Sequence, residues 1–131
     1  MKFMVCYDDS KESKKALAVA WEHAKVWGAT LEVVNSIERE LSLKRSFIEK
    51  KEQDLENEVK AVLSGSGISY EVDLLIDTLS PEEQMVRFAK KEAIDQIFIG
   101  VEKQSKVGKL VFGSTAQYMI LKAPCPVVTV K

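Results

Sequence analysis

Residues 3–10 read Phe3-Met4-Val5-Cys6-Tyr7-Asp8-Asp9-Ser10, a nearly continuous apolar run that ends in two acids and a serine. A short unbroken apolar run predicts a strand of a parallel sheet, because helices cover both faces of such a strand. Asp9 or Ser10 is expected to cap a helix directly afterwards, and Asp9 with Glu12 three residues later fits a capping box. The stretch therefore predicts a buried strand that leads straight into a helix.

The same alternation of strand and helix patterns continues along the chain. Residues 37–45 have no clear period and are predicted to be a connection. Val62 in the second helix and Ala93 in the third are expected to face the core. Further strands are predicted around 31–34, 70–76, 97–100 and 127–130, and helices around 10–27, 46–63, 81–93 and 113–121. Strands that alternate with helices predict an α/β fold with an open parallel sheet and helices on both faces.

Length and composition favour a single globular domain over residues 1–131. The formal net charge of −1 provides no global field to attract nucleic acid or an anionic membrane, so neither is expected as a partner. No apolar run approaches the roughly 20 residues of a membrane span, and no signal-peptide pattern opens the chain, so a cytoplasmic protein is expected. Cys6 and Cys125 lack C-x-x-C spacing and are predicted to be ordinary buried thiols.

Several catalytic motifs are missing. The first strand-to-helix turn contains no glycine, so it lacks the dinucleotide-binding fingerprint. Gly108-Lys109 is followed by Leu110 where a Walker loop requires Ser or Thr. His23 is the only histidine, and no second carboxylate is expected near the first strand's end. We therefore predict that the protein is not an enzyme, with slow ATP hydrolysis as the most that is expected.

One candidate binding site lies at the carboxyl edge of the predicted sheet, where ligands of open α/β proteins bind. Asp8 ends the first strand and could accept a hydrogen bond from a base amino group or a ribose hydroxyl. Gly100 ends the fourth strand and permits close approach of a ligand. Gly113-Ser114-Thr115 offers backbone amides and two hydroxyls at a helix start, where the dipole favours an anion. Alternatively, Ser114 only caps its helix and the lysines between are solvated.

Two segments resemble the universal stress protein family. The first runs from Gly100-Val101-Glu102-Lys103 to Gly113-Ser114-Thr115, with Ala123-Pro124-Cys125-Pro126-Val127-Val128 behind it; the second is Val5-Cys6-Tyr7-Asp8-Asp9-Ser10 followed by Ala16-Leu17. The resemblance covers essentially the whole chain. It implies a five-stranded parallel sheet of order 3-2-1-4-5, similar to adenine nucleotide alpha hydrolases, and a homodimer in which the strand Val127–Val130 pairs with its copy.

Some members of that family bind ATP through Gly-x-x-Gly followed nine residues later by Gly-Ser or Gly-Thr, whereas others bind no nucleotide. Asp8, Gly100 and Gly113-Ser114 match the family's positions, but Lys103 replaces the second glycine. A lysine there could fill the phosphate space or pair with the phosphate, and Lys109 adds positive charge to the same segment. The expected ligand is ATP or AMP, with Mg²⁺ bound through the phosphates.

The resemblance thus implies a nucleotide-binding regulatory or stress-response module. In the leading hypothesis, ATP or AMP orders residues 101–112 and thereby alters a surface for an unidentified protein partner. In the alternative hypothesis, Lys103 blocks the phosphate site and the protein is a nucleotide-free dimeric interaction module, which offers its charged helix 42–64 to partners.

Overall fold

Five parallel strands form one sheet in the order β3-β2-β1-β4-β5 in the computed structural model, which describes residues 1–102 and 113–131. The strands are β1 (Lys2–Cys6), β2 (Thr30–Glu38), β3 (Tyr70–Asp77), β4 (Gln96–Gly100) and β5 (Val127–Val130). Both the α/β class and the predicted strand order are confirmed. Strand β2 extends to Glu38, so the predicted connection starts two residues later than expected.

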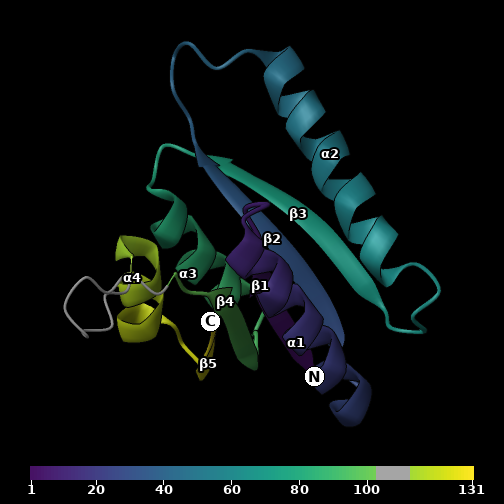
Figure 1. Ribbon diagram of the computed structural model, residues 1–131. Coiled ribbons are helices and arrows are strands. Elements are labelled where there is room, and N and C mark those ends of the chain that lie inside the picture. The colour runs from purple at the N-terminus through teal and green to yellow at the C-terminus, as the bar shows by residue number, and fades with distance from the viewer. Residues whose placement is uncertain (103–112) are drawn as a thin grey trace.

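Four helices cover the sheet: α1 (Lys11–Trp27), α2 (Arg45–Leu63), α3 (Pro81–Lys91) and α4 (Ser114–Lys122). Helices α1 and α2 lie on one face and α3 and α4 on the other (Figure 1). Alternate strand residues therefore enter two separate cores. Phe3 and Val5 of β1 pack towards α1 and α2, whereas Met4 and Cys6 pack towards α3 and α4. This explains why residues 3–6 of the strand are all apolar.

The turn between β1 and α1 differs from the predicted capping box. Ser10 is the N-cap, because its Oγ accepts a hydrogen bond from the Ser13 amide at 3.1 Å, and the Ser13 hydroxyl donates to the Ser10 carbonyl at 2.9 Å. Asp9 precedes the helix with a φ of 66°, a left-handed conformation that aspartate tolerates better than most residues. Of the two predicted caps, Ser10 is therefore confirmed, whereas the Asp9–Glu12 capping box is wrong, and Asp8 stands just before the tight turn.

Two predicted inward-facing residues were also misplaced by one position. On α2 the buried residues are Leu55, Val59 and Leu63, whereas Val62 is 47% exposed. Helix α3 ends at Lys91, and Ala93 is exposed with a φ of 52°. The left-handed turn at Ala93 moves the next apolar contact to Ile94, which is buried. The helical spacing of apolar residues predicts burial only as far as the helix extends, and Ala93 lies beyond the end of α3.

Within the described residues, none of the helices combines the length and the apolarity that a bilayer span requires. Both cysteines are free thiols, with Cys6 buried and Cys125 half-buried.

Candidate functional site

A hollow of about 520 Å³ opens at the carboxyl edge of the sheet. It lies between the ends of β1, β2 and β4 and the starts of α1, α3 and α4. The chain leaves β1 towards α1 on one face and leaves β4 towards the α4 side on the other, so the hollow occupies the switch point where a crevice is expected. Its described lining consists of Cys6, Tyr7, Asp8, Ser10, Glu12, Ser13, Val34, Asn35, Ser36, Pro81, Met85, Ile99, Gly100, Val101, Glu102, Gly113, Ser114, Thr115 and Ala116.

Five of the seven predicted site residues line this hollow together, although they come from three separate parts of the sequence. They are Asp8, Gly100, Gly113, Ser114 and Thr115. The other two, Lys103 and Lys109, lie outside the described residues. Strand pairing brings the ends of β1 and β4 side by side, since Cys6 is the register partner of Ile99.

Asp8 is held as an ionised carboxylate at the edge of the hollow. Partial burial alone would raise the pKa of its carboxyl, but hydrogen bonds from Ser10 and Ser13 outweigh burial and lower the pKa below its ordinary value. The Ser10 amide donates to Asp8 Oδ1 at 3.0 Å, and the Asp8 amide donates to Ser13 Oγ at 3.4 Å. At neutral pH Asp8 is therefore a fixed hydrogen-bond acceptor, suited to a hydroxyl or an amino group.

Gly100 is required by packing. A Cβ at this position would overlap the backbone carbonyl group of Glu12 and would lie 2.7 Å from the Glu12 Cβ. The first turn of α1 therefore rests directly on the end of β4. The close approach that the sequence indicated is made by the protein's own helix, and it positions Glu12 at the hollow.

Gly113 is not required by packing against the described residues. Its φ of −62° and ψ of 162° suit any residue, and a Cβ would meet no atom within 4 Å. The described residues do not explain a glycine here. Absence of a side chain at this point leaves the backbone at the start of α4 open to a ligand.

Among the described residues, the start of α4 is an uncapped helix N-terminus in the wall of the hollow. Gly113 is the N-cap, has no side chain to accept from the first amides, and is followed by no acid in the first turn. The Gln117 amide donates to the Gly113 carbonyl at 3.1 Å, whereas the amides of Ser114, Thr115 and Ala116 precede the first intrahelical bond. The interpretation of Ser114 as a helix cap was therefore wrong. Such a terminus favours an anion.

Sequence reasoning missed the opposite wall of the hollow. Val34–Ser36 at the end of β2 and Pro81 and Met85 of α3 form this wall. The Ser36 hydroxyl donates to the Pro81 carbonyl at 2.9 Å, and this bond joins the strand to the helix start. The carboxyl-edge rule could have identified these residues, had it been applied to the second strand as well as to the first and fourth.

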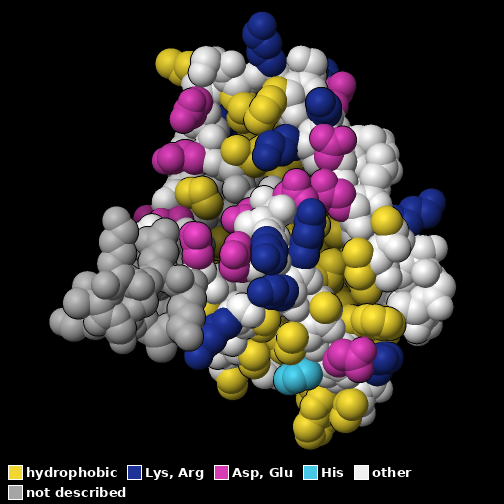
Figure 2. All heavy atoms as spheres, in the orientation of Figure 1, with side chains coloured by type: hydrophobic (Ala, Val, Ile, Leu, Met, Phe, Trp, Pro, Cys, Tyr) yellow, Lys and Arg dark blue, Asp and Glu magenta, His cyan; other side chains and the backbone are white. Residues whose placement is uncertain are grey.

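Three carboxylates line the hollow instead of the single one expected. They belong to Asp8, Glu12 and Glu102, and no Lys, Arg or His accompanies them among the described lining residues. The basic residues assigned to the site belong to the part of the chain that the structure does not describe. Elsewhere, basic and acidic side chains are intermingled over the face shown in Figure 2, in keeping with the net charge of −1.

A parallel sheet of order 3-2-1-4-5 with a hollow at its switch point, an acceptor at the end of β1 and a helix start opposite is typical of open α/β proteins, which bind ligands at this edge. The model of the universal stress protein family matches residues 1–131. A universal stress protein of Thermus aquaticus is 33% identical, over 98% of this chain and 96% of the relative. The chain belongs to the universal stress protein family, which confirms the resemblance.

Two solved structures from Archaeoglobus fulgidus share this fold. A universal stress protein with 32% identity has a TM-score of 0.86, and the match covers 100% of this chain and 98% of the other. A universal stress protein solved in complex with dAMP has 28% identity and a TM-score of 0.83, with the same coverage.

Proposed function

We propose that the hollow binds an adenine nucleotide, ATP or AMP, and that the protein acts as a nucleotide-binding regulatory module of the stress response. The observation that carries this proposal is the uncapped start of α4 in the same hollow as the ionised Asp8. The two features match the two ends of a nucleotide, because one favours an anion and the other accepts a hydrogen bond. The 28% identical relative in complex with dAMP supports the same class of ligand.

The proposed orientation follows from the chemistry of the walls. Asp8 receives a ribose hydroxyl or the base amino group, while Val34, Pro81 and Met85 provide apolar contact. The phosphate lies at Gly113, Ser114 and Thr115, next to Gly100, and Lys103 and Lys109 contribute positive charge. Mg²⁺ carried on the phosphates would reduce repulsion between the phosphates and the carboxylates of Glu12 and Glu102.

Ligand-dependent thermal stability tests the proposal. A nucleotide at about 100 times its dissociation constant should add about 2.7 kcal/mol to the free energy of unfolding. AMP, ATP and dAMP are each tested with and without Mg²⁺, against wild type, Asp8→Asn and the exposed control Asp54→Asn on α2. Stabilisation of wild type and of the control, but not of Asp8→Asn, is expected. An unchanged melting temperature with every nucleotide would remove the proposal.

Lys103→Gly separates the proposal from the nucleotide-free alternative. If Lys103 pairs with the phosphate, the variant binds AMP more weakly than wild type. Affinity that appears only in the variant would instead assign the protein to the interaction-module class.

The response to the nucleotide is assigned to residues 101–112, which join β4 to α4. Contact between this segment and the phosphate would order it and change the surface offered to a protein partner. Hydrogen exchange with and without AMP measures this directly. Protection confined to the hollow, with none in 101–112, would contradict the assignment.

Binding, not turnover, is the proposed activity. The three carboxylates of the hollow lack a described histidine or lysine that would complete an acid–base pair. Steady Mg²⁺-dependent ATP hydrolysis at about one turnover per second or faster, abolished in Asp8→Asn, would overturn this assignment.

Assembly as a homodimer through β5 is also proposed. Strand β5 is the edge of the sheet, and its Val127, Val128 and Val130 are half-buried. An apolar edge strand with unpaired backbone groups is readily covered by a second copy, which removes an aggregation hazard.

A further inference from the structure

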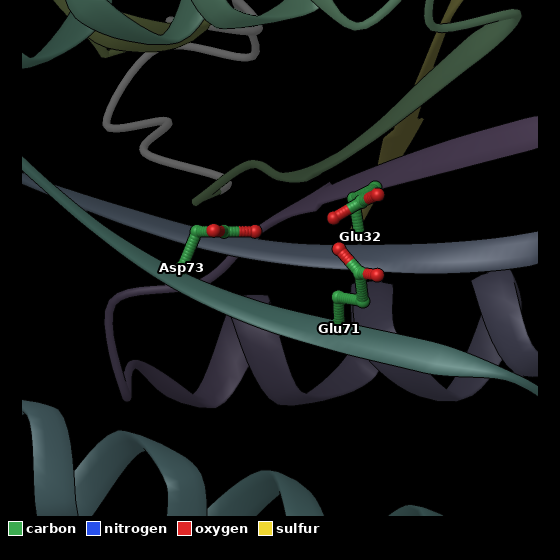
Figure 3. A group of neighbouring side chains, drawn as sticks. All are labelled: Glu32, Glu71 and Asp73. Carbon is green, nitrogen blue, oxygen red and sulfur yellow. The ribbon is translucent and has the colours of Figure 1, made fainter.

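A second polar cluster lies within the sheet, on strands β2 and β3. Glu32 and Glu71 are register partners on these neighbouring strands, and Asp73 follows Glu71 by two residues, so all three side chains project from the same face. One oxygen from each carboxylate lies within 4.8 Å of the other two. Figure 3 shows these oxygens directed towards one shared space. Strand pairing therefore concentrates three acids on a rigid part of the fold.

Glu32 is an unusual place for a carboxylate, because its side chain is only 3% exposed. Its Oε2 atom is buried and accepts no hydrogen bond from any described residue. Burying a polar oxygen without a partner costs about 1–3 kcal/mol, and more when the group is charged. The structure of the described residues therefore contains an unmet need for a positive partner at this oxygen.

The described side chains do not supply that partner. Across residues 1–102 and 113–131, no ion pair within 4.0 Å reaches Glu32, Glu71 or Asp73. Lys2 acts on Glu32 from a distance, but its Nζ atom pairs with Glu92 at 3.4 Å. Like charges directly opposite each other on paired strands are destabilising.

Burial, the hydrogen bond with Asp73 and the charges of Glu71 and Asp73 raise the pKa of the Glu32 carboxyl to about 7.

From the juxtaposition of these three carboxylates, one of which is buried with an unpartnered oxygen, we infer that Glu32, Glu71 and Asp73 bind a hard divalent cation. Ca²⁺ suits the spacing, since its bonds to oxygen of about 2.3–2.6 Å let one ion join oxygens up to roughly 5 Å apart. Mg²⁺, with bonds near 2.0–2.1 Å and strict octahedral geometry, can join oxygens only up to about 4.2 Å apart, a narrower range than the 4.8 Å within which these oxygens lie. Glu71 is exposed, so water can complete the coordination shell.

This site is separate from the nucleotide hollow. None of the three residues lines the hollow. Glu32 is the register partner of Met4, whose side chain packs in the core beneath α3 and α4. A cation here is held by the protein alone, unlike an Mg²⁺ ion that arrives on nucleotide phosphates.

Calorimetric titration of the full chain with CaCl₂ and with MgCl₂, after chelator treatment and without nucleotide, tests the inference. Wild type is expected to take up one Ca²⁺ per chain, more tightly than Mg²⁺, with a rise in melting temperature. Glu71→Gln and Asp73→Asn are each expected to lose about tenfold or more in Ca²⁺ affinity, because the charge and number of ligands set affinity.

Two controls show whether the loss is specific. Glu52→Gln, on the exposed face of α2, and Asp8→Asn, in the hollow, should both bind Ca²⁺ as wild type does. Glu71 is on the surface, so its variant should retain the fold, and circular dichroism is the measurement that checks this. Glu32→Gln should bind no Ca²⁺ and, in chelator at pH 8, should melt above wild type because it removes a buried charge.

No binding heat and no change in melting temperature up to about 10 mM Ca²⁺ would overturn the inference, since even weak protein sites act near 1 mM. Equal binding by wild type and by the two ligand variants would overturn it as well.

Discussion

Gly100 lies at the end of β4 and Gly113 at the start of α4, and both belong to the sequence pattern associated with nucleotide binding. A Cβ at Gly100 would overlap the Glu12 backbone, whereas one at Gly113 would meet no described atom. The motif could be recognised from the sequence, but the reason for each glycine could not. That reason depends on which backbone approaches the residue from another part of the chain.

Alanine substitutions distinguish the two glycines. Gly100→Ala forces α1 away from β4 and is expected to lower the free energy of unfolding by about 1–3 kcal/mol or more, as overpacking does. Gly113→Ala changes only a helix N-cap and should cost less than about 1 kcal/mol. It should nevertheless weaken AMP binding, because the new methyl group would restrict access of the ligand to the backbone amides at the start of α4. Urea unfolding and AMP titration measure the two effects; a severely destabilised Gly113→Ala would contradict this account.

The thiol of Cys6 is expected to be unreactive in the folded protein. Burial, reinforced by the nearby charge of Asp8, raises the pKa of Cys6 to about 12. At pH 8 about one molecule in ten thousand would carry the reactive thiolate. Iodoacetamide labelling followed by mass spectrometry should modify Cys6 only after unfolding. Labelling of native Cys6 at the rate of free cysteine would contradict this expectation, because it would show that the reagent reaches the Cys6 thiol through the hollow.

Asp77 should make stability depend on pH in the acid range. Its Oδ1 accepts hydrogen bonds from the amides of Leu79 and Thr78, at 3.3 and 2.6 Å, and these bonds lower the pKa of its carboxyl. A carboxyl with a lowered pKa contributes stability above its ordinary pKa near 3.8, and this contribution is lost as pH falls through the lowered value. Below pH 4, the melting temperature of wild type should therefore fall more steeply with decreasing pH than that of Asp77→Asn. Parallel curves would rule out this contribution.

At the scale of elements, the sequence predicted the five strands and four helices of the described residues. Apolar residues recur at every second position of a half-buried strand and about every 3.6 positions of a helix, so their period indicates the type of element. Details failed where a single local contact sets the boundary. The Ser10–Ser13 hydrogen bonds make Ser10, and not Asp9, the cap of α1, and the left-handed Ala93 ends α3 early. The acidic cluster was not predicted at all, because Glu32 and Glu71 meet only through the pairing of β2 with β3.

Helix α2 provides a test of these corrected faces. Leu55 is 5% exposed and belongs to the core beneath α1 and α2, so Leu55→Ala should cost about 2–5 kcal/mol. Val62, predicted to be buried, is 47% exposed, and Val62→Ala should change stability by about 0.5 kcal/mol or less. Urea unfolding measures both values. A cost for Val62→Ala comparable to that of Leu55→Ala would contradict the described orientation of the helix.

At the scale of the whole molecule, the position of the hollow could be predicted because carboxyl ends of parallel strands meet at one edge. Its far wall from Val34 to Ser36 was missed, although the same rule identifies it when applied to the second strand, whose predicted apolar pattern ends at Val34. The carboxylate of Glu12 reaches the hollow only because Gly100 lets α1 approach β4 so closely.

The proposed dimer depends on the free edge of β5. The Ile97 amide donates to the Pro126 carbonyl and the Val101 amide to the Val130 carbonyl, so the alternation of a parallel ladder directs the Thr129 amide outwards. Thr129→Pro removes this outward donor without removing a bond to β4, and proline is tolerated on edge strands. Sedimentation is expected to show a dimer for wild type and for the control Thr129→Val, and a monomer for Thr129→Pro. A dimeric proline variant would exclude β5 pairing.

The N-cap of helix α4, Gly113, lies in the hollow. Residues 123–126 connect the other end of the helix to β5 at the edge of the sheet. The nine residues of α4 span only about 13 Å, so a shift at its first turn is carried almost rigidly to the rim. On the opposite side of the hollow, α1 packs directly against Gly100, and this contact makes that wall rigid. If both proposals hold, ligand occupancy and self-association become reciprocally linked: each must alter the other's equilibrium constant by the same factor.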